Sequence, residues 1–274
     1  MIVDTHSHVQ FHAFDKDADQ VIEKNLAQHI WMINVGTNYQ TSQKAVELAG
    51  KYAQGLYAAI GLHPMYAASE FIKLKTDPDE GEFLLPEQDF DKEKYLALAS
   101  RSKKVVAVGE IGLDYYYKPK SKEKLTQFKE KQKKVFLEQL DLAKELNVPV
   151  ILHCRMAHDD VIEILQTQEG ITGVVHCFTG TLEQAKKYTA LGFYLGFNGI
   201  IFKFNVDEVI KNIPLDNMLV ETDCPYLTPP QEAGKRNEPM FIKHTIEKIA
   251  ELRGVDFQEV AKKTTENAKK LFKI

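Results

Sequence analysis

Residues 105–114 read Val-Val-Ala-Val-Gly-Glu-Ile-Gly-Leu-Asp, a nearly continuous apolar run that holds Glu110 and closes on Asp114. This pattern is typical of a strand in a parallel sheet whose two faces are both covered. Seven further runs of the same character follow one another along the chain: residues 2–6, 30–37, 56–63, 150–155, 173–178, 193–198 and 218–223. The sequence therefore predicts eight parallel strands.

Segments of helical periodicity separate most of these runs. They are residues 17–29, 41–54, 122–146, 159–168, 182–191, 207–212, 241–252 and 257–272. Repeated strand–helix alternation predicts an α/β fold, a (β/α)₈ TIM barrel. A doubly wound open sheet is the alternative, but no glycine-rich phosphate-binding fingerprint follows the first strand.

One acidic, turn-rich segment, residues 75–92, interrupts this rhythm. Acidic residues and prolines favour an exposed loop insertion there, before a short helix over residues 95–100. The insertion lies between the third and fourth predicted strands.

The composition is that of a globular protein with a sizeable core. The chain has 274 residues, of which 44% are hydrophobic and 27% charged, and we expect one domain over residues 1–274. The net charge of −4 excludes a global basic field, so a nucleic-acid substrate would need a local basic patch. No apolar run approaches the ~18 residues of a membrane span. Three cysteines cannot all pair, which favours a reducing, cytoplasmic location.

The ends of the predicted strands collect metal-binding side chains. Barrel enzymes place their sites at the C-terminal strand ends, and residues i and i+2 of a strand face the same way. His6 and His8 therefore share one face at the end of the first strand. Four other strands end in a potential ligand; the complete set is His6, His8, Glu110, His153, His176 and Asp223.

Six ligands are too many for one tetrahedral ion with an open position, and they suit two divalent ions. Mixed nitrogen and oxygen donors fit Zn²⁺ or Mn²⁺, and Mg²⁺ where waters complete the coordination sphere. Glu110 is the best candidate for a bridging ligand. Asp223 is the best candidate to touch metal and take a proton from the attacking water, so Glu110 and Asp223 are the predicted catalytic residues.

Basic and aromatic residues surround the same barrel end. The candidate substrate-binding residues are His63, Arg155, Lys203 and Arg236. Arginine and lysine at a barrel rim suit phosphate recognition. Aromatic residues near strand ends, including residues 115–117, could stack on bases, although packing at the rim explains them equally well.

With these motifs in order, the chain resembles the TatD family of metal-dependent deoxyribonucleases, within the amidohydrolase-like barrels. The resemblance rests on residues 4–8, 61–64, 109–115, 149–155, 176–180, 221–227 and 236–239. It implies a (β/α)₈ barrel with a divalent-metal centre that hydrolyses DNA phosphodiesters, typically at single-stranded 3′ ends. By motif match it also implies the six ligands above, and it puts His63 and Arg155 near the scissile phosphate. Departures such as Val9-Gln10 and Met156 leave every ligand in place.

Two other readings stay open on the sequence. One is an ester or amide hydrolase on the same scaffold, such as a deacylase of D-aminoacyl-tRNA. The other is a non-catalytic, metal-dependent nucleic-acid binder, although a retained Asp223 would be idle in such a protein. The sequence leaves the oligomeric state open, and a monomer is compatible with it.

Overall fold

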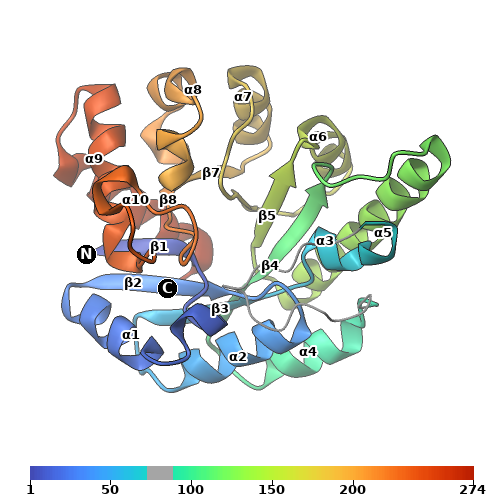
Figure 1. Cartoon of the computed structure of the whole chain (residues 1–274), viewed down its shortest axis with the longest axis horizontal. Helices are drawn as coiled ribbons and strands as arrows, with labels where there is room; N and C mark the ends of the chain where they lie inside the picture. The colour runs from blue at the N-terminus through green and yellow to red at the C-terminus, as the bar shows by residue number, and fades with distance from the viewer. Residues whose placement is uncertain (73–88) are drawn as a thin grey trace.

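Eight strands form one parallel sheet in the order β1 to β8 in the computed structural model, which describes residues 1–72 and 89–274 (Figure 1). The strands are β1 (Ile2–Ser7), β2 (Ile30–Val35), β3 (Leu56–Ile60), β4 (Val105–Asp114), β5 (Val150–Arg155), β6 (Gly173–Val175), β7 (Tyr194–Phe197) and β8 (Met218–Val220). Every neighbouring pair is parallel.

The two edges of this sheet meet, so the barrel is nearly closed. Ser7 of β1 forms a parallel bridge with Cys224, just beyond β8. The buried carboxylate of Asp4 accepts hydrogen bonds from the backbone N–H and the hydroxyl of Thr222, at 2.9 and 2.5 Å. The first and last strands are therefore tied together at their C-terminal ends, which confirms the predicted TIM barrel.

The helices lie around the outside of the strands, with α2 and α4 on one side and α7 and α8 on the opposite side (Figure 1). They are α1 (Ala18–Ala27), α2 (Tyr39–Gly50), α3 (Pro64–Ala67), α4 (Lys92–Ser100), α5 (Lys122–Leu146), α6 (His158–Gln166), α7 (Leu182–Ala190), α8 (Asp207–Asn212), α9 (Ile242–Arg253) and α10 (Phe257–Phe272). Helix α5 begins where the Ser121 hydroxyl accepts the Lys124 N–H, and it ends at Asn147 in the left-handed conformation.

The barrel interior is apolar at its N-terminal end. A buried cluster takes alternate residues from the strands, among them Val3, Ile33, Ala107 and Ile151, and joins them to Leu271 and Phe272 at the end of α10. The end of α10 therefore closes the N-terminal end of the barrel. The polar side chains lie at the opposite, C-terminal end.

Several strands end earlier than the apolar runs suggest. Strand β6 stops at Val175 and β8 at Val220, whereas the sequence predicts strands to 178 and 223. Cys177 and Asp223 have positive φ angles of 47° and 57°, which take the chain out of extended conformation. The two predicted ligands of these segments therefore sit just past their strands.

The predicted acidic insertion falls mainly on residues 73–88, outside the described residues. The expected short helix is α4, which begins at Lys92 after the side chain of Asp91 accepts the Lys94 N–H. In the described part of the chain, no helix is both long and apolar enough to cross a membrane.

A candidate metal centre at the C-terminal end of the barrel

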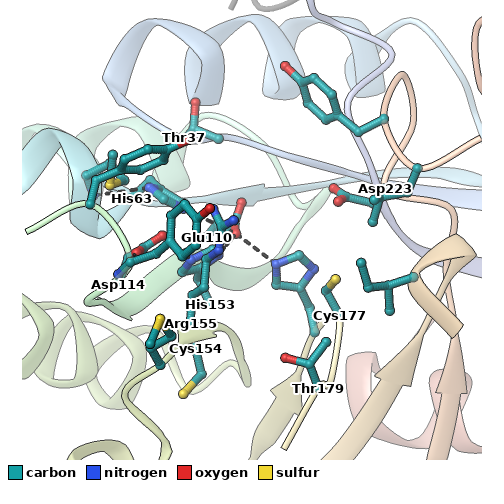
Figure 2. Close-up of a pocket in the computed structure, with 18 of the residues that line it drawn as sticks. Thr37, His63, Glu110, Asp114, His153, Cys154, Arg155, Cys177, Thr179 and Asp223 are labelled. Carbon is teal, nitrogen blue, oxygen red and sulfur yellow. Dashed lines mark hydrogen bonds and ion pairs between the residues drawn. The ribbon is translucent and has the colours of Figure 1, made fainter. Parts of the chain in front are cut away.

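A cavity of about 590 Å³ opens where the strands end, and polar side chains from seven strand ends line it. Figure 2 shows Glu110 beside His63 and His153, with Asp223 across the cavity from them. Two partly overlapping clusters of imidazoles and carboxylates meet there.

The first cluster surrounds Glu110, which β4 holds almost fully buried. One of its oxygens, Oε1, lies 2.8 Å from Nδ1 of His153 and 2.9 Å from Nε2 of His176. The other, Oε2, lies 3.5 Å from Nε2 of His6. Burial alone would raise the pKa of Glu110, but the charge of His176 and the hydrogen bonds with His153 and His176 hold it well below its usual value. Glu110 is therefore an ionised carboxylate whose two oxygens face different histidines.

The second cluster joins the His6-x-His8 motif to Asp223. The Nε2 atoms of His6 and His8 lie 3.1 Å apart, and Oδ1 of Asp223 lies 3.7 and 3.4 Å from them. The backbone N–H of Asp223 donates to the His6 carbonyl at 2.8 Å, which fixes the aspartate beside the histidines. Burial alone would raise the pKa of Asp223, but the His8 hydrogen bond and the neighbouring imidazoles lower it. Asp223 is therefore ionised at neutral pH.

The donor set fits divalent cations. Nδ1 of His8 lies 2.7 Å from the Val35 carbonyl oxygen, so this nitrogen carries the proton and donates it. In a neutral ring the lone pair is then on Nε2, which faces His6 and Asp223. Buried nitrogen lone pairs and carboxylate oxygens that converge in this way are a ligand arrangement for ions such as Zn²⁺ or Mn²⁺.

Three groups of potential ligands meet this geometry, each with its donor atoms within 4.8 Å of one another. They are His6–Glu110–His176, His6–His8–Asp223 and His63–Glu110–His153. All six metal ligands expected from the sequence belong to these groups. Their coordination of an ion stays a prediction that the geometry supports.

Two supporting carboxylates, Asp114 and Glu221, have no role in the sequence-based prediction. Oδ2 of Asp114 lies 3.0 Å from Nε2 of His153, and Oε1 of Glu221 lies 3.4 Å from Nδ1 of His176. Strand alternation could have identified both residues, because residues at even spacing in a strand face the same side. Asp114 is four residues after Glu110, and Glu221 is two residues before Asp223.

These carboxylates set the charge of the histidines they contact. Burial alone would lower the pKa of His153, but the hydrogen bonds that the ring donates to Asp114 and Glu110 raise it to about 9. Burial also opposes the charge of His176, yet Glu110 and Glu221 raise its pKa well above the usual value. Each ring is thereby oriented and made a stronger base, as outer partners do for metal-binding histidines.

His63 presents a hydrogen-bond donor to the cavity. Its Nδ1 accepts the Met65 N–H at 3.2 Å, at the start of α3. Burial and the neighbouring His153 lower its pKa to about 3, so the ring is neutral and its proton is on Nε2. That N–H points toward Glu110, 3.5 Å away.

Arg155 also lines the cavity, and its guanidinium carbon lies 3.7 Å from the ring centroid of Tyr116. The structure therefore brings two of the four predicted substrate-binding residues, His63 and Arg155, to the cavity.

The other two predicted substrate-binding residues, Lys203 and Arg236, do not line it. Lys203 is exposed beyond β7. Arg236 donates to both carboxylate oxygens of Asp17, at 2.9 and 2.7 Å, and lies 3.3 Å from Glu238. Substrate contact by Lys203 or Arg236 stays a prediction.

Comparisons with known proteins agree with this architecture. The family model described as TatD related DNase matches residues 3–273. The chain is 41% identical over 280 residues to the uncharacterized metal-dependent hydrolase YabD of Bacillus subtilis strain 168, covering all of both chains. It is 34% identical over 272 residues to the 3'-5' ssDNA/RNA exonuclease TatD of Escherichia fergusonii, covering 95% of each. Among solved structures, the TatD homologue YJJV of Escherichia coli K12 superposes with a TM-score of 0.81 at 32% identity, covering 100% of this chain and 98% of that one.

Proposed function

This chain belongs to the TatD-related DNase family of metal-dependent hydrolases, and we propose that it cleaves phosphodiester bonds of DNA, acting from the 3′ ends of single strands. The relative from Escherichia fergusonii, which is named as a 3'-5' ssDNA/RNA exonuclease, supports this substrate class.

The observation that carries the proposal is the position of Glu110 between two sets of histidines. One oxygen faces His153 and His176 and the other faces His6, as a bridging carboxylate would require. We therefore propose that two divalent ions (Zn²⁺, Mg²⁺ or Mn²⁺) are held by His6, His8, Glu110, His153, His176 and Asp223. When bound, such ions polarise a phosphodiester and lower the pKa of a water molecule.

Asp223 is the residue we assign to proton transfer. Its side chain is 15% exposed, so it borders the open part of the cavity, and its lowered pKa means that the carboxylate is ionised at neutral pH. A positioned base of this kind contributes roughly 10²–10⁴-fold to a hydrolysis rate.

His63 and Arg155 would hold the phosphate. The Nε2–H of His63 and the guanidinium of Arg155 are both donors at the cavity, because the acceptor nitrogen of His63, Nδ1, is turned to the Met65 N–H. Donors aimed at phosphate oxygens offset the negative charge that grows in the transition state.

The test is hydrolysis of a 5′-labelled single-stranded DNA by metal-stripped protein, with Mg²⁺, Mn²⁺ or Zn²⁺ added back in turn. We expect a ladder of products shortened from the 3′ end, formed only when a metal is added. A D-aminoacyl-tRNA is assayed beside it. Loss of the aminoacyl ester without any DNA cleavage, by protein with bound metal, would replace the nuclease assignment with that of an esterase on the same scaffold.

The cytoplasmic location stays a prediction from the sequence, and the oligomeric state stays open.

A further inference from the structure

Exposed apolar side chains are concentrated at the mouth of the cavity. Over residues 1–72 and 89–274, six large hydrophobic side chains are exposed, and four of them line this cavity. These four are Tyr116, Tyr117, Met156 and Phe204, between 46% and 64% exposed. Exposed apolar side chains gathered around one cavity are typical of a binding surface.

The two tyrosines form a fixed platform on one lip of the mouth. Their ring centroids lie 4.7 Å apart with the planes at 87°. Arg155 stacks over Tyr116 at 3.7 Å and so restrains that ring. The backbone N–H of Tyr116 donates to the Asp114 carboxylate at 2.8 Å, which ties the platform to the metal site.

A local excess of positive charge begins at the same place. Lys118, Lys120, Lys122 and Lys124 follow the tyrosines in the loop and first turn of α5, with Glu123 as the one acid among them, although the chain as a whole is acidic. All four lysines are exposed. Among the described residues none of these four has an ion-pair partner, whereas Lys133 farther along α5 is paired with Asp160 at 2.9 Å.

We propose that Tyr116, Tyr117, Lys118, Lys120, Lys122 and Lys124, here called the tyrosine–lysine track, bind the unpaired strand that leads to the scissile phosphate. Bases stack on the tyrosine rings and phosphates contact the lysines. Stacked pairs inside a duplex cannot offer their base faces in this way, so the track selects single strands. This inference rests on the proposed function. It assigns strand binding to residues outside the metal centre.

Nucleic acid is the occupant that fits both observations together. Aromatic rings followed directly by exposed lysines suit a flexible polyanion that carries flat bases. An apolar protein partner would use the four exposed hydrophobic side chains but leave the lysines without a role.

Binding is measured first, in the Asp223→Asn background so that the strand is not degraded. Fluorescence anisotropy with a 5′-fluorescein oligothymidylate gives Kd at several salt concentrations in the presence of Mg²⁺. Replacing two phosphate-contacting lysines, in Lys118→Gln/Lys120→Gln, should weaken binding and reduce the slope of log Kd against log salt by about 1.4.

The matched control is Lys262→Gln/Lys270→Gln. It makes the same charge change on α10, the helix that closes the opposite end of the barrel. A salt slope in the track variant equal to that of the control, or a duplex bound as tightly as the single strand, would overturn the proposal.

Base stacking is tested with Tyr117→Leu. We choose Tyr117 and not Tyr116 because the Tyr116 ring also contacts Arg155. We expect KM for oligothymidylate to rise at least about fivefold. Hydrolysis of an abasic oligodeoxynucleotide of the same length, which has phosphates but no bases, should keep its kcat/KM. An unchanged KM for the oligonucleotide overturns base stacking on Tyr117. If wild-type protein hydrolyses neither compound, the proposed function fails, while the anisotropy result still decides whether the track binds single strands.

Discussion

Glu221 lies behind His176, with its Oε1 3.4 Å from Nδ1 of the ring whose Nε2 lies 2.9 Å from Glu110. The same Glu221 oxygen accepts hydrogen bonds from the Cys177 N–H at 2.7 Å and the Asn198 amide at 2.9 Å. A fully buried carboxylate with these partners cannot rotate freely, so it fixes the direction in which His176 faces the cavity.

Neutralising Glu221 should therefore weaken metal binding without removing a ligand. For Glu221→Gln we expect a metal Kd roughly 10–100-fold higher, and activity that recovers as metal is added. Competition with a chromogenic chelator measures this Kd. The control is Glu251→Gln on the exposed surface of α9. Equal metal affinity in both variants would show that Glu221 only fills space.

Replacing Glu110 should change the number of bound ions. In Glu110→Gln the carboxylate that faces both histidine sets becomes a neutral amide, so we expect at least one ion fewer per chain than in the wild type. Elemental analysis after dialysis gives the ratio of metal to protein. An unchanged ratio in a folded variant rules Glu110 out as a bridging ligand.

Arg236 should contribute to stability more than to substrate binding. Its guanidinium forms two hydrogen bonds with Asp17 and lies over the Phe14 ring at 4.0 Å. Lysine cannot keep this two-pronged contact, so Arg236→Lys should lower the free energy of unfolding by about 1 kcal/mol.

Urea unfolding and DNA hydrolysis are compared for this variant. We expect kcat/KM for single-stranded DNA to stay within about twofold of the wild type. A large loss of kcat/KM at unchanged stability would instead place Arg236 at the substrate, as the sequence alone predicts.

His158 should make the protein sensitive to acid. Its Nδ1 lies 3.2 Å from both the Cys154 sulfur and the Tyr188 hydroxyl oxygen, and burial lowers its pKa to about 4. The unfolded chain binds the proton near pH 6.5, so stability is complete above that pH and declines as pH falls toward 4. The full loss in the free energy of unfolding between neutral pH and pH 4 corresponds to about 3 kcal/mol.

The variant His158→Gln should lose this dependence. Between pH 7 and pH 4 its free energy of unfolding should fall by less than that of the wild type, by up to about 3 kcal/mol. Chemical unfolding at a series of pH values provides the comparison. Parallel curves for the two proteins would show that folding does not lower the pKa of His158.

The sequence predicts the elements of this barrel well wherever the pattern is long and local. Residues 105–114, 150–155 and 122–146 form β4, β5 and α5 with the predicted bounds. The predicted strands extend too far where a non-glycine residue has a positive φ angle, as at Cys177. Apolar composition does not report this backbone conformation. The four-residue helix α3 was not predicted, since its start depends on the His63 ring accepting a backbone N–H.

For the site, position at a strand end was sufficient to bring the six expected ligands together around one cavity. The sequence does not reveal contacts between residues that are far apart along the chain. Arg236 pairs with Asp17, 219 residues away, and no local pattern distinguishes that contact from a free rim arginine.

The most direct test of the account is the single-turnover rate of cleavage of single-stranded DNA by Asp223→Asn, compared with wild type at equal metal occupancy. If Asp223 accepts the proton of the attacking water, the rate should fall by roughly 10²–10⁴-fold while DNA binding is retained. A rate within about threefold of the wild type, in protein carrying the same metal, would contradict the assignment of this cavity as a metal-dependent phosphodiesterase site that uses Asp223 as its base.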